Sequence, residues 1–269
     1  MGGLIYCREP EVTEPYYVRE LGIFLYSAEE LCYYIVNYVL LIPSDFIGEN
    51  LYRFIGRQLR RPELEEKLRG WMSQQADMYQ GLLVILQDIH YYGDEELVQF
   101  RQKLEEFKRA SGPEMMKKRG DFYLDVNQCG NALRTYDLLL GEKGLDAGFQ
   151  ARIWHNRGVA CVRLMQMREA MDCFFRAWQV LKEESIVREM FILYCMEPGL
   201  TMPGEAIADV SGETQYRWKE ELDAFRKNAA YMGKAKEIAE AFHKDVIRRR
   251  EALRELLCGW KQEYREMAG

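Results

Sequence analysis

Two segments in the middle of the chain are similar to each other, and this internal similarity limits the folds that the chain can adopt. In each segment a bulky residue lies four positions before a glycine, an alanine follows that glycine by twelve positions, and an aromatic residue follows the alanine by four. The two glycines, Gly120 and Gly158, are thirty-eight residues apart. Small residues at these positions favour two helices that cross closely. The pattern therefore predicts two successive helical hairpins.

These offsets resemble the tetratricopeptide repeat, over about residues 113–182. The resemblance implies antiparallel helical hairpins that stack into an α-solenoid. The usual period of that family is about 34 residues, and the four additional residues fall in the connecting segment 141–148. The chain departs from the family pattern at Arg119 and Arg157, where leucine is usual. Two repeats cannot bury a solenoid core alone, so the flanking helices are expected to cover them.

In that family the first helix of each repeat lines a concave groove that holds an extended peptide or a partner helix. Carried over by position, the resemblance implies the following groove residues: Lys117, Asp121, Leu124, Asp125, Arg152, His155, Asn156, Val159 and Arg163. Lys117 and Asn156 match two positions with which chaperone-binding members hold a C-terminal carboxylate, but Asp121 stands where asparagine is usual and would repel that group. The resemblance therefore implies a mixed-charge groove for another peptide or protein, unless the C-terminal helices of the same chain fill it.

Residues 27–110 are predicted to form helical hairpins, because apolar residues recur there at steps of three and four. Ser27 and Glu30 form a capping-box pattern at the start of the first helix, and Pro62 suits the first turn of a later one. The expected helices run over residues 27–42, from 44 or 45 to about 60, from 62 onward, over 73–92 and from 94 to about 110. Short connections between them indicate antiparallel neighbours.

Residues before this region have a different character. The runs Leu4–Cys7 and Ile23–Tyr26 favour β-strands, and Pro10 and Pro15 between them suit turns and extended chain. We therefore expect a small two-stranded ribbon at the N-terminus. A ribbon of this size is marginal alone and needs helices to pack against.

The C-terminal part is predicted to be helical as well. Residues 184–196 are expected to form a third first helix or a cap, residues 197–212 an irregular stretch, and residues 213–267 an almost continuous helix. One straight helix of that length would extend about 80 Å. The apolar stripe shifts its phase at 231–233, which favours a bend or a break there over a long helix that pairs with a second copy.

The fold class expected from these patterns is mainly α, with antiparallel helical hairpins in an array, a small N-terminal β-ribbon and long C-terminal helices. The expected domains are an N-terminal helical region over 1–110, the repeats with a capping helix over 111–197, and a C-terminal long helix or helical hairpin over 198–269. Ser111-Gly112-Pro113 is the clearest break between the first two.

Composition and motifs exclude several classes of function. The formal net charge is −6, which gives no general attraction for nucleic acid or anionic lipid. The basic cluster over 244–254, which contains the run 248–250, is interleaved with acidic residues and is interpreted as a solvated helix face. The seven cysteines contain no CxxC pair, which indicates reduced thiols and a cytoplasmic protein without disulfides or bound metal. No signal peptide is visible, and the most apolar window, 31–42, is too short to span a membrane.

No motif for a nucleophile, a metal or a phosphate site occurs, and the three histidines are isolated from one another. We therefore expect a protein that is not an enzyme and needs no cofactor. The primary hypothesis is a protein–protein interaction scaffold that binds a peptide or partner helix. Two alternatives remain: a peptide-responsive signalling regulator that uses the N-terminal helical bundle, and a structural homodimer formed through the C-terminal helix.

Overall fold

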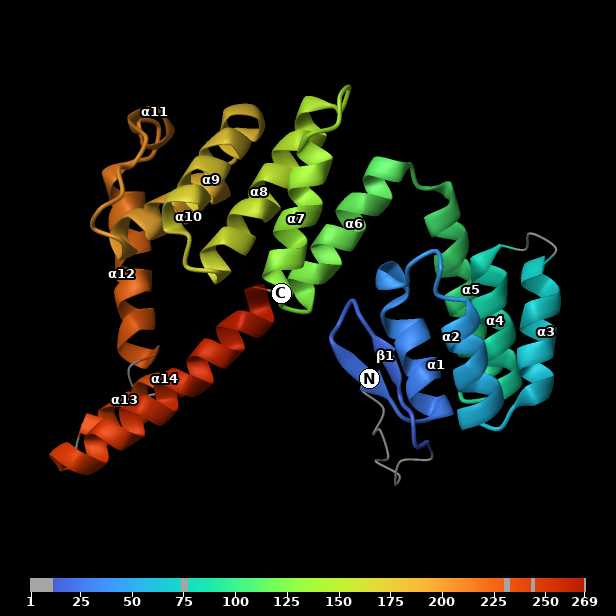
Figure 1. The fold of residues 1–269 in the computed structure, drawn as a ribbon. Helices are drawn as coiled ribbons and strands as arrows, with labels where there is room; N and C mark the ends of the chain where they lie inside the picture. Colours follow the sequence, from blue (N-terminus) through green and yellow to red (C-terminus); the bar gives the residue numbers. More distant parts are fainter. Residues whose placement is uncertain (1–11, 74–76, 230–232, 243–244, 269) are drawn as a thin grey trace. The chain divides into compact units, whose positions relative to one another are not determined.

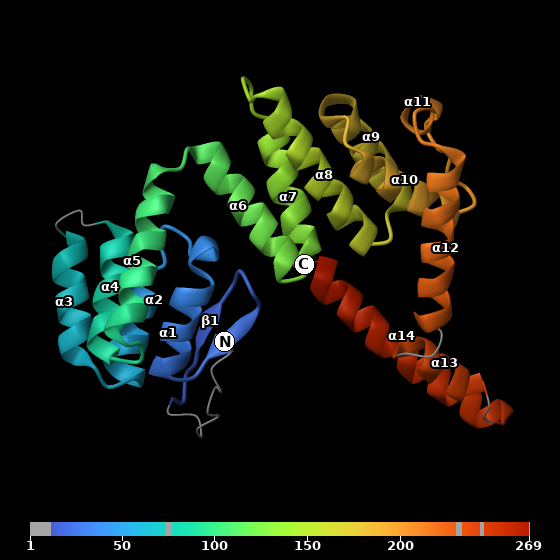
Figure 2. The same cartoon turned by 180° about the vertical axis from the view of Figure 1, so that it is seen from behind.

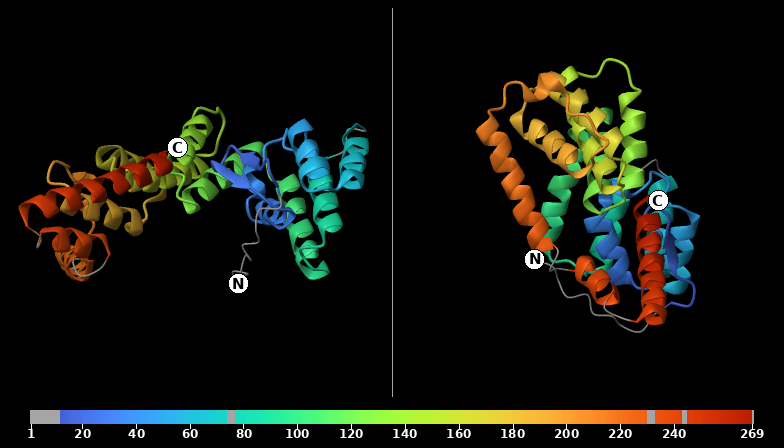
Figure 3. Two further views of the ribbon diagram at one scale, coloured as in Figure 1. Left: turned by 60° about the horizontal axis from the view of Figure 1, so that its bottom comes forward. Right: turned by 90° about the vertical axis from the view of Figure 1, so that its left-hand side faces the viewer.

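The structure is a computed structural model that describes residues 12–73, 77–229, 233–242 and 245–268 (Figure 1). The described chain is mainly α-helical, as predicted, and consecutive helices pack against each other. The chain divides into two compact units, Met1–Ser111 and Gly112–Gly269, which are described separately. The same ribbon is seen from other sides in Figure 2 and Figure 3.

The first unit begins with an antiparallel ribbon of strands β1 (Tyr16–Val18) and β2 (Ile23–Leu25). The prediction of a ribbon is confirmed, but its first strand is Tyr16–Val18, and Leu4–Cys7 lies outside the described residues. A short turn joins the strands, and Gly22 has the positive φ of +67° that such turns require. Val18 and Leu25 bury their side chains, so one face of the ribbon belongs to the core.

The helices of the first unit are α1 (Ala28–Asn37), α2 (Glu49–Arg53), α3 (Pro62–Ser73), α4 (Met78–Ile89) and α5 (Asp94–Arg109). A 3-10 turn, η1 (Val39–Leu41), follows α1, and a π-helical segment, η2 (Phe54–Gln58), continues α2. The Ser27 hydroxyl accepts from the Glu30 amide at 3.2 Å, which confirms the predicted cap. The predicted start of α3 at Pro62 is also confirmed.

Three predicted helices of the first unit have wrong boundaries. The helix expected over 27–42 ends at Asn37, and the 3-10 turn η1 follows it. The helix expected from residue 44 begins only at Glu49, because residues 43–48 form a turn in which the Phe46 amide donates to the Pro43 carbonyl at 3.1 Å. Phe46 and Ile47 are nevertheless buried, so their spacing reflected burial and not helical backbone. The helix expected over 73–92 begins at Met78, where the Asp77 side chain caps it.

The second unit contains two complete hairpins, α6 (Gly112–Asp125) with α7 (Cys129–Leu140) and α8 (Ala147–Arg163) with α9 (Met167–Leu181). Helix α10 (Glu184–Met196) packs on α9 and has the predicted bounds. Figure 1 and Figure 2 show α6 to α10 following one another side by side. The short helix α11 (Gly204–Ile207) then leads to α12 (Gly212–Ala229), which packs on α10.

The two hairpins share one backbone geometry at their turns. Asn127 and Met165, thirty-eight residues apart, both have positive φ, 61° and 59°. Gln128 and Gln166, which follow them, both have φ of −88° with ψ of 59° and 68°. The amide of each glutamine donates to the carbonyl five residues earlier, at 2.8 and 2.9 Å. The internal similarity of the sequence thus corresponds to a repeated backbone.

The glycines of the two copies lie where an aromatic ring meets the first helix. A Cβ atom at Gly120 would lie 2.6 Å from Cε1 of Tyr136, and a Cβ atom at Gly158 would lie 2.6 Å from Cε1 of Phe174. Such a distance is far below van der Waals contact, so only glycine allows the ring to lie this close. Both rings are buried.

The C-terminal part of the second unit is divided into α12, α13 (Lys234–Phe242) and α14 (Val246–Ala268). The predicted break is present: Gly233 precedes α13 with a φ of +57°, although residues 230–232 lie outside the described part. The sequence did not predict the second interruption, between α13 and α14. Helix α14 packs on α7, and Met267 contacts the core cluster that contains Leu124 and Cys129. Among the described residues, no helix combines the length and the apolar character needed to span a membrane.

Candidate functional site

The predicted groove residues lie on two neighbouring first helices. Four of them are on α6 and five on α8: Lys117, Asp121, Leu124 and Asp125, then Arg152, His155, Asn156, Val159 and Arg163. The structure connects four of these through hydrogen bonds. Together with Glu189 of α10 they form what we call the polar strip: Lys117, Asp121, Asn156, His155 and Glu189.

The polar strip runs from α6 across α8 to α10. The Lys117 ammonium lies 2.6 Å from Oδ2 of Asp121, and Nδ2 of Asn156 donates to Oδ1 of Asp121 at 2.8 Å. Oδ1 of Asn156 lies 3.1 Å from Nδ1 of His155, and Nε2 of His155 lies 2.9 Å from Oε2 of Glu189. Helices α6, α8 and α10 are therefore joined by one chain of hydrogen bonds, in which the carboxylates of Asp121 and Glu189 take part.

The hydrogen-bond partners of His155 favour its protonated form. Asn156 uses its Nδ2 for Asp121, so the atom that it presents to His155 is an acceptor oxygen. The second ring nitrogen faces the Glu189 carboxylate, which is also an acceptor. Both bonds form only when both ring nitrogens carry a proton, that is, in the imidazolium form. The pKa of His155 is accordingly raised above its ordinary value of 6.5, chiefly by the hydrogen bond to Glu189.

Asp121 links the polar strip to the hydrophobic core. The hydroxyl of Tyr136 donates to Oδ1 of Asp121 at 2.8 Å, and the Tyr136 ring is fully buried against Gly120. Burial and the nearby Asp121 carboxylate raise the pKa of Tyr136 well above its usual range, so its hydroxyl keeps the proton that it donates. The carboxylate of Asp121 therefore accepts from Lys117, Tyr136 and Asn156 at once and is held in one position.

The strip remains open to solvent in part. The side chains of Asp121 and Glu189 are 34% and 38% exposed. Among the described residues, the five strip side chains form hydrogen bonds only with residues of α6, α7, α8 and α10. Helix α14 packs on α7, and its described residues form no hydrogen bond with these five side chains. The strip is therefore a preformed surface that presents cations and carboxylates in alternation.

The structure does not join the other predicted residues to the strip. Leu124 is buried in the core cluster of the first hairpin. The Arg163 guanidinium donates to the Leu124 carbonyl and thus caps the end of α6. Arg152 is exposed, with its guanidinium 5.9 Å from the centre of the Phe149 ring. Val159 packs against the core, and Asp125 is exposed.

The sequence reasoning missed Glu189. A signal was available: His155 and Glu189 are 34 residues apart, and Asp121 and Asn156 are 35 residues apart, which is about one repeat length. Aligning α10 as a third first helix at that spacing would have placed Glu189 beside His155.

The described residues contain no candidate metal site. Among the described residues, no three histidine, cysteine, aspartate or glutamate side chains gather closely enough to hold a metal ion. The chain matches no protein-family model, no curated protein and no solved structure. Its function must therefore be inferred from its own geometry.

Proposed function

We propose that the chain is a docking scaffold without catalytic activity, in which α6 to α10 act as a tetratricopeptide-like array that binds a peptide or partner helix along the polar strip. The observation that carries this proposal is the continuity of the strip over α6, α8 and α10. A ligand lying across these helices would meet donors at Lys117 and Asn156 and acceptors at Asp121 and Glu189.

Preorganisation supports a binding role for the strip. Each of its side chains is held by at least one neighbour before any ligand arrives. Binding would then require little further ordering of side chains, which is a substantial cost for flexible lysine and glutamate residues. Carboxylate oxygens accept more than one hydrogen bond, so Asp121 and Glu189 keep capacity for a ligand.

The geometry of the polar strip also limits the class of ligand that could bind there. Lys117 and Asn156, the two residues that match a carboxylate clamp, already donate to Asp121 at 2.6 and 2.8 Å. A C-terminal carboxylate placed there would compete with the Asp121 carboxylate and be repelled by it. We therefore propose an internal peptide segment or a helix with polar and basic side chains, not a free C-terminus.

Selection from a random peptide library on the full-length chain tests the proposal. Enriched peptides are then measured by fluorescence polarisation against the wild type and a Lys117→Gln/Glu189→Gln variant, which changes the two ends of the strip and leaves Asp121 and Tyr136 intact. Loss of two charge-assisted hydrogen bonds is expected to weaken binding at least about tenfold.

A matched control removes the same two kinds of charge outside the strip. Glu142→Gln/Lys143→Gln changes an exposed pair in the connection between α7 and α8 and should leave binding unchanged. Failure to enrich any peptide, or equal loss of binding in both double variants, would contradict the docking role of the strip.

A further inference from the structure

The first unit contains a cavity that the proposed docking function does not use. Its volume is about 650 Å³, which lies within the range of small-molecule sites. Strand β1 and the turn after it form one wall, and the chain from Pro43 through α2 and η2 forms the other. Every residue that lines it belongs to the first unit, whereas the polar strip lies in the second.

A side chain of the π-helical segment holds the two walls together. Oε1 of Gln58 accepts hydrogen bonds from the amide and the hydroxyl of Thr13, at 3.3 and 3.2 Å, and from the amide of Glu14 at 3.3 Å. The residues before β1 are thus attached to η2, forty-five positions further along the chain. π-Helical turns are rare and occur frequently at functional sites.

Three of the side chains that line the cavity form an aromatic cluster: Tyr16, Phe46 and Phe54. The Tyr16 ring lies 5.7 Å from the Phe46 ring and 5.6 Å from the Phe54 ring, measured between ring centres. Phe46 and Phe54 are buried, so they form the floor and not the rim. Such a surface suits a flat apolar group.

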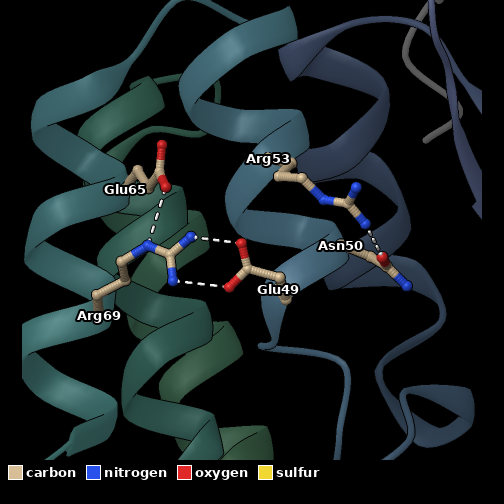
Figure 4. Close-up of polar contacts among 5 residues, drawn as sticks. All are labelled: Glu49, Asn50, Arg53, Glu65 and Arg69. Atoms are coloured by element: carbon tan, nitrogen blue, oxygen red, sulfur yellow. Dashed lines mark hydrogen bonds and ion pairs between the residues drawn. The ribbon is translucent and has the colours of Figure 1, made fainter.

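In the described part of the chain, two arginines on the α2 wall form no salt bridge, although both lie near enough to Glu49 to act on it through their charge. Arg53 donates only to the amide oxygen of Asn50, at 2.7 Å, and Arg57 makes no hydrogen bond or salt bridge to any residue in the described part of the chain. Figure 4 shows Arg53 beside Asn50, with Glu49 directed away from it toward Arg69.

Glu49, the carboxylate closest in sequence to Arg53, is paired with an arginine that does not line the cavity. Arg69 of α3 donates two hydrogen bonds to Glu49, both of 2.8 Å, and one to Glu65 of 2.9 Å (Figure 4). These bonds from Arg69 are the main reason that the pKa of Glu49 is lowered. Glu49 thus forms its salt bridge with Arg69, and Arg53 and Arg57, which act on Glu49 through their charge alone, keep guanidinium donors for a ligand.

Acidic side chains also line the cavity: Glu14, Glu20 and Asp45, in addition to Glu49. Burial, and after it the nearby Glu20 and Asp45 carboxylates, raise the pKa of Tyr16 to about 12. A second anionic group on a ligand would be repelled by these carboxylates, whereas the protonated phenol can donate a hydrogen bond. The cavity therefore suits a ligand with a single anionic group.

We propose that this cavity binds a small molecule with an apolar, preferably aromatic, body and one carboxylate or phosphate group, which Arg53 and Arg57 hold while the body lies on Tyr16, Phe46 and Phe54. Arginine pairs bind such anions through planar, bidentate hydrogen bonds. The ring would lie on the aromatic side chains that line the cavity, and the anionic group would face the two arginines.

The test uses four probes that share one ring and differ in charge: phenyl phosphate, phenylacetate, benzyl alcohol and benzylamine. Binding to the full-length chain is measured by ligand-observed NMR. We expect the two anions to bind more tightly than the alcohol, and the amine to bind least. Comparison of phenyl phosphate with phenylacetate identifies which anion the arginines prefer.

Variants locate the binding. Arg53→Gln/Arg57→Gln should weaken the better anion at least about tenfold, because charge-assisted hydrogen bonds are lost, and should leave benzyl alcohol unchanged. Arg101→Gln, at an exposed arginine of α5 in the same unit, is the matched control. The single variant Arg57→Gln is measured as well, because this side chain forms no hydrogen bond or salt bridge with a described residue and its loss should disturb the fold little. The proposal is overturned if neither anion binds, if benzylamine binds as well as the anions, or if the arginine variants bind like the control.

Discussion

Replacing Gly158 by alanine should destabilise the second unit although alanine is the better helix former. The added Cβ atom would lie 2.6 Å from Cε1 and 2.7 Å from Cδ1 of Phe174. Phe174 is only 2% exposed and is enclosed by the core of the second hairpin. The ring therefore has no free space to enter, and α8 and α9 must move apart.

The expected magnitude follows from two opposing terms. Overpacking of a core of this kind costs about 1–3 kcal/mol, and a change from glycine to alanine within a helix gains about 1 kcal/mol. Gly259→Ala in α14 is a matched control, because a Cβ atom at Gly259 would meet nothing within 4 Å. The helix-propensity gain is common to both variants, so the difference between their stabilities isolates the steric cost of about 1–3 kcal/mol.

Urea unfolding of the full-length chain measures both variants, and hydrogen exchange of α8 and α9 amides assigns the change to the second hairpin. A third variant, Phe174→Leu, should cost less in the Gly158→Ala background than in the wild type, because the smaller side chain relieves the contact. The reasoning is refuted if Gly158→Ala is as stabilising as Gly259→Ala, or if the two substitutions at the contact are simply additive.

Three further predictions concern the second unit. Because the folded-state pKa of His155 is raised, its bond to Glu189 should contribute fully below pH 6.5 and be lost as the pH rises through that pKa. The free energy of unfolding measured by urea titration should therefore fall by about 0.2–1 kcal/mol in this range, and Glu189→Gln should flatten the pH profile. A stability that rises with pH in the wild type alone would contradict this. Met165→Asn should raise the melting temperature, because asparagine adopts the left-handed backbone of this position at a cost lower by about 1 kcal/mol. Met165 is 74% exposed, so little burial is lost, and a lower melting temperature would contradict the strain. Arg157→Gln should lower the free energy of unfolding by about 1–3 kcal/mol, because the Arg157 guanidinium donates to Asp137 at 2.7 Å and to the Cys173 sulfur at 2.9 Å. Equal effects of Asp137→Asn and Arg157→Gln would show that the bond to the sulfur adds nothing.

Local signals in the sequence predicted the helices whose ends depend on one or two side chains. Ser27 caps α1 with its own hydroxyl, and Pro62 needs no amide partner in the first turn of α3. The bounds of α10 were predicted correctly for a similar reason, because the chain after Met196 is rich in proline and glycine. In each case the information lies within one helical turn of the boundary.

Backbone conformation was not predictable where apolar residues come from a turn. Phe46 and Ile47 show helical spacing, yet they enter the core from a turn closed by Pro43 and Gly48. Hydrophobic periodicity reports which residues are buried and not how their backbone is bonded. The π-helical segment Phe54–Gln58 was missed because its sequence is also compatible with an ordinary α-helix.

The two candidate sites differ in how far the sequence could predict them. Asp121, His155 and Asn156 followed from an alignment of two copies, which transfers positions from one hairpin to the next. The cavity had no such source. Its aromatic cluster joins Tyr16 with Phe54, residues from remote segments that are also linked by the hydrogen bonds from Thr13 to Gln58. Contacts between remote and unrelated segments leave no periodic signal.

The second unit connects its packing to its candidate site through one residue pair. Gly120 lacks a Cβ atom, so the Tyr136 ring lies against α6, and this position brings its hydroxyl to Asp121 at 2.8 Å. In the second hairpin the corresponding ring, Phe174, has no hydroxyl, and the residue that corresponds to Asp121 is Val159. The steric part of the pattern therefore repeats while the polar part does not. Under the proposed docking function, this difference lets the two first helices present different chemistry to one ligand, while the same glycine–ring contact holds each hairpin together.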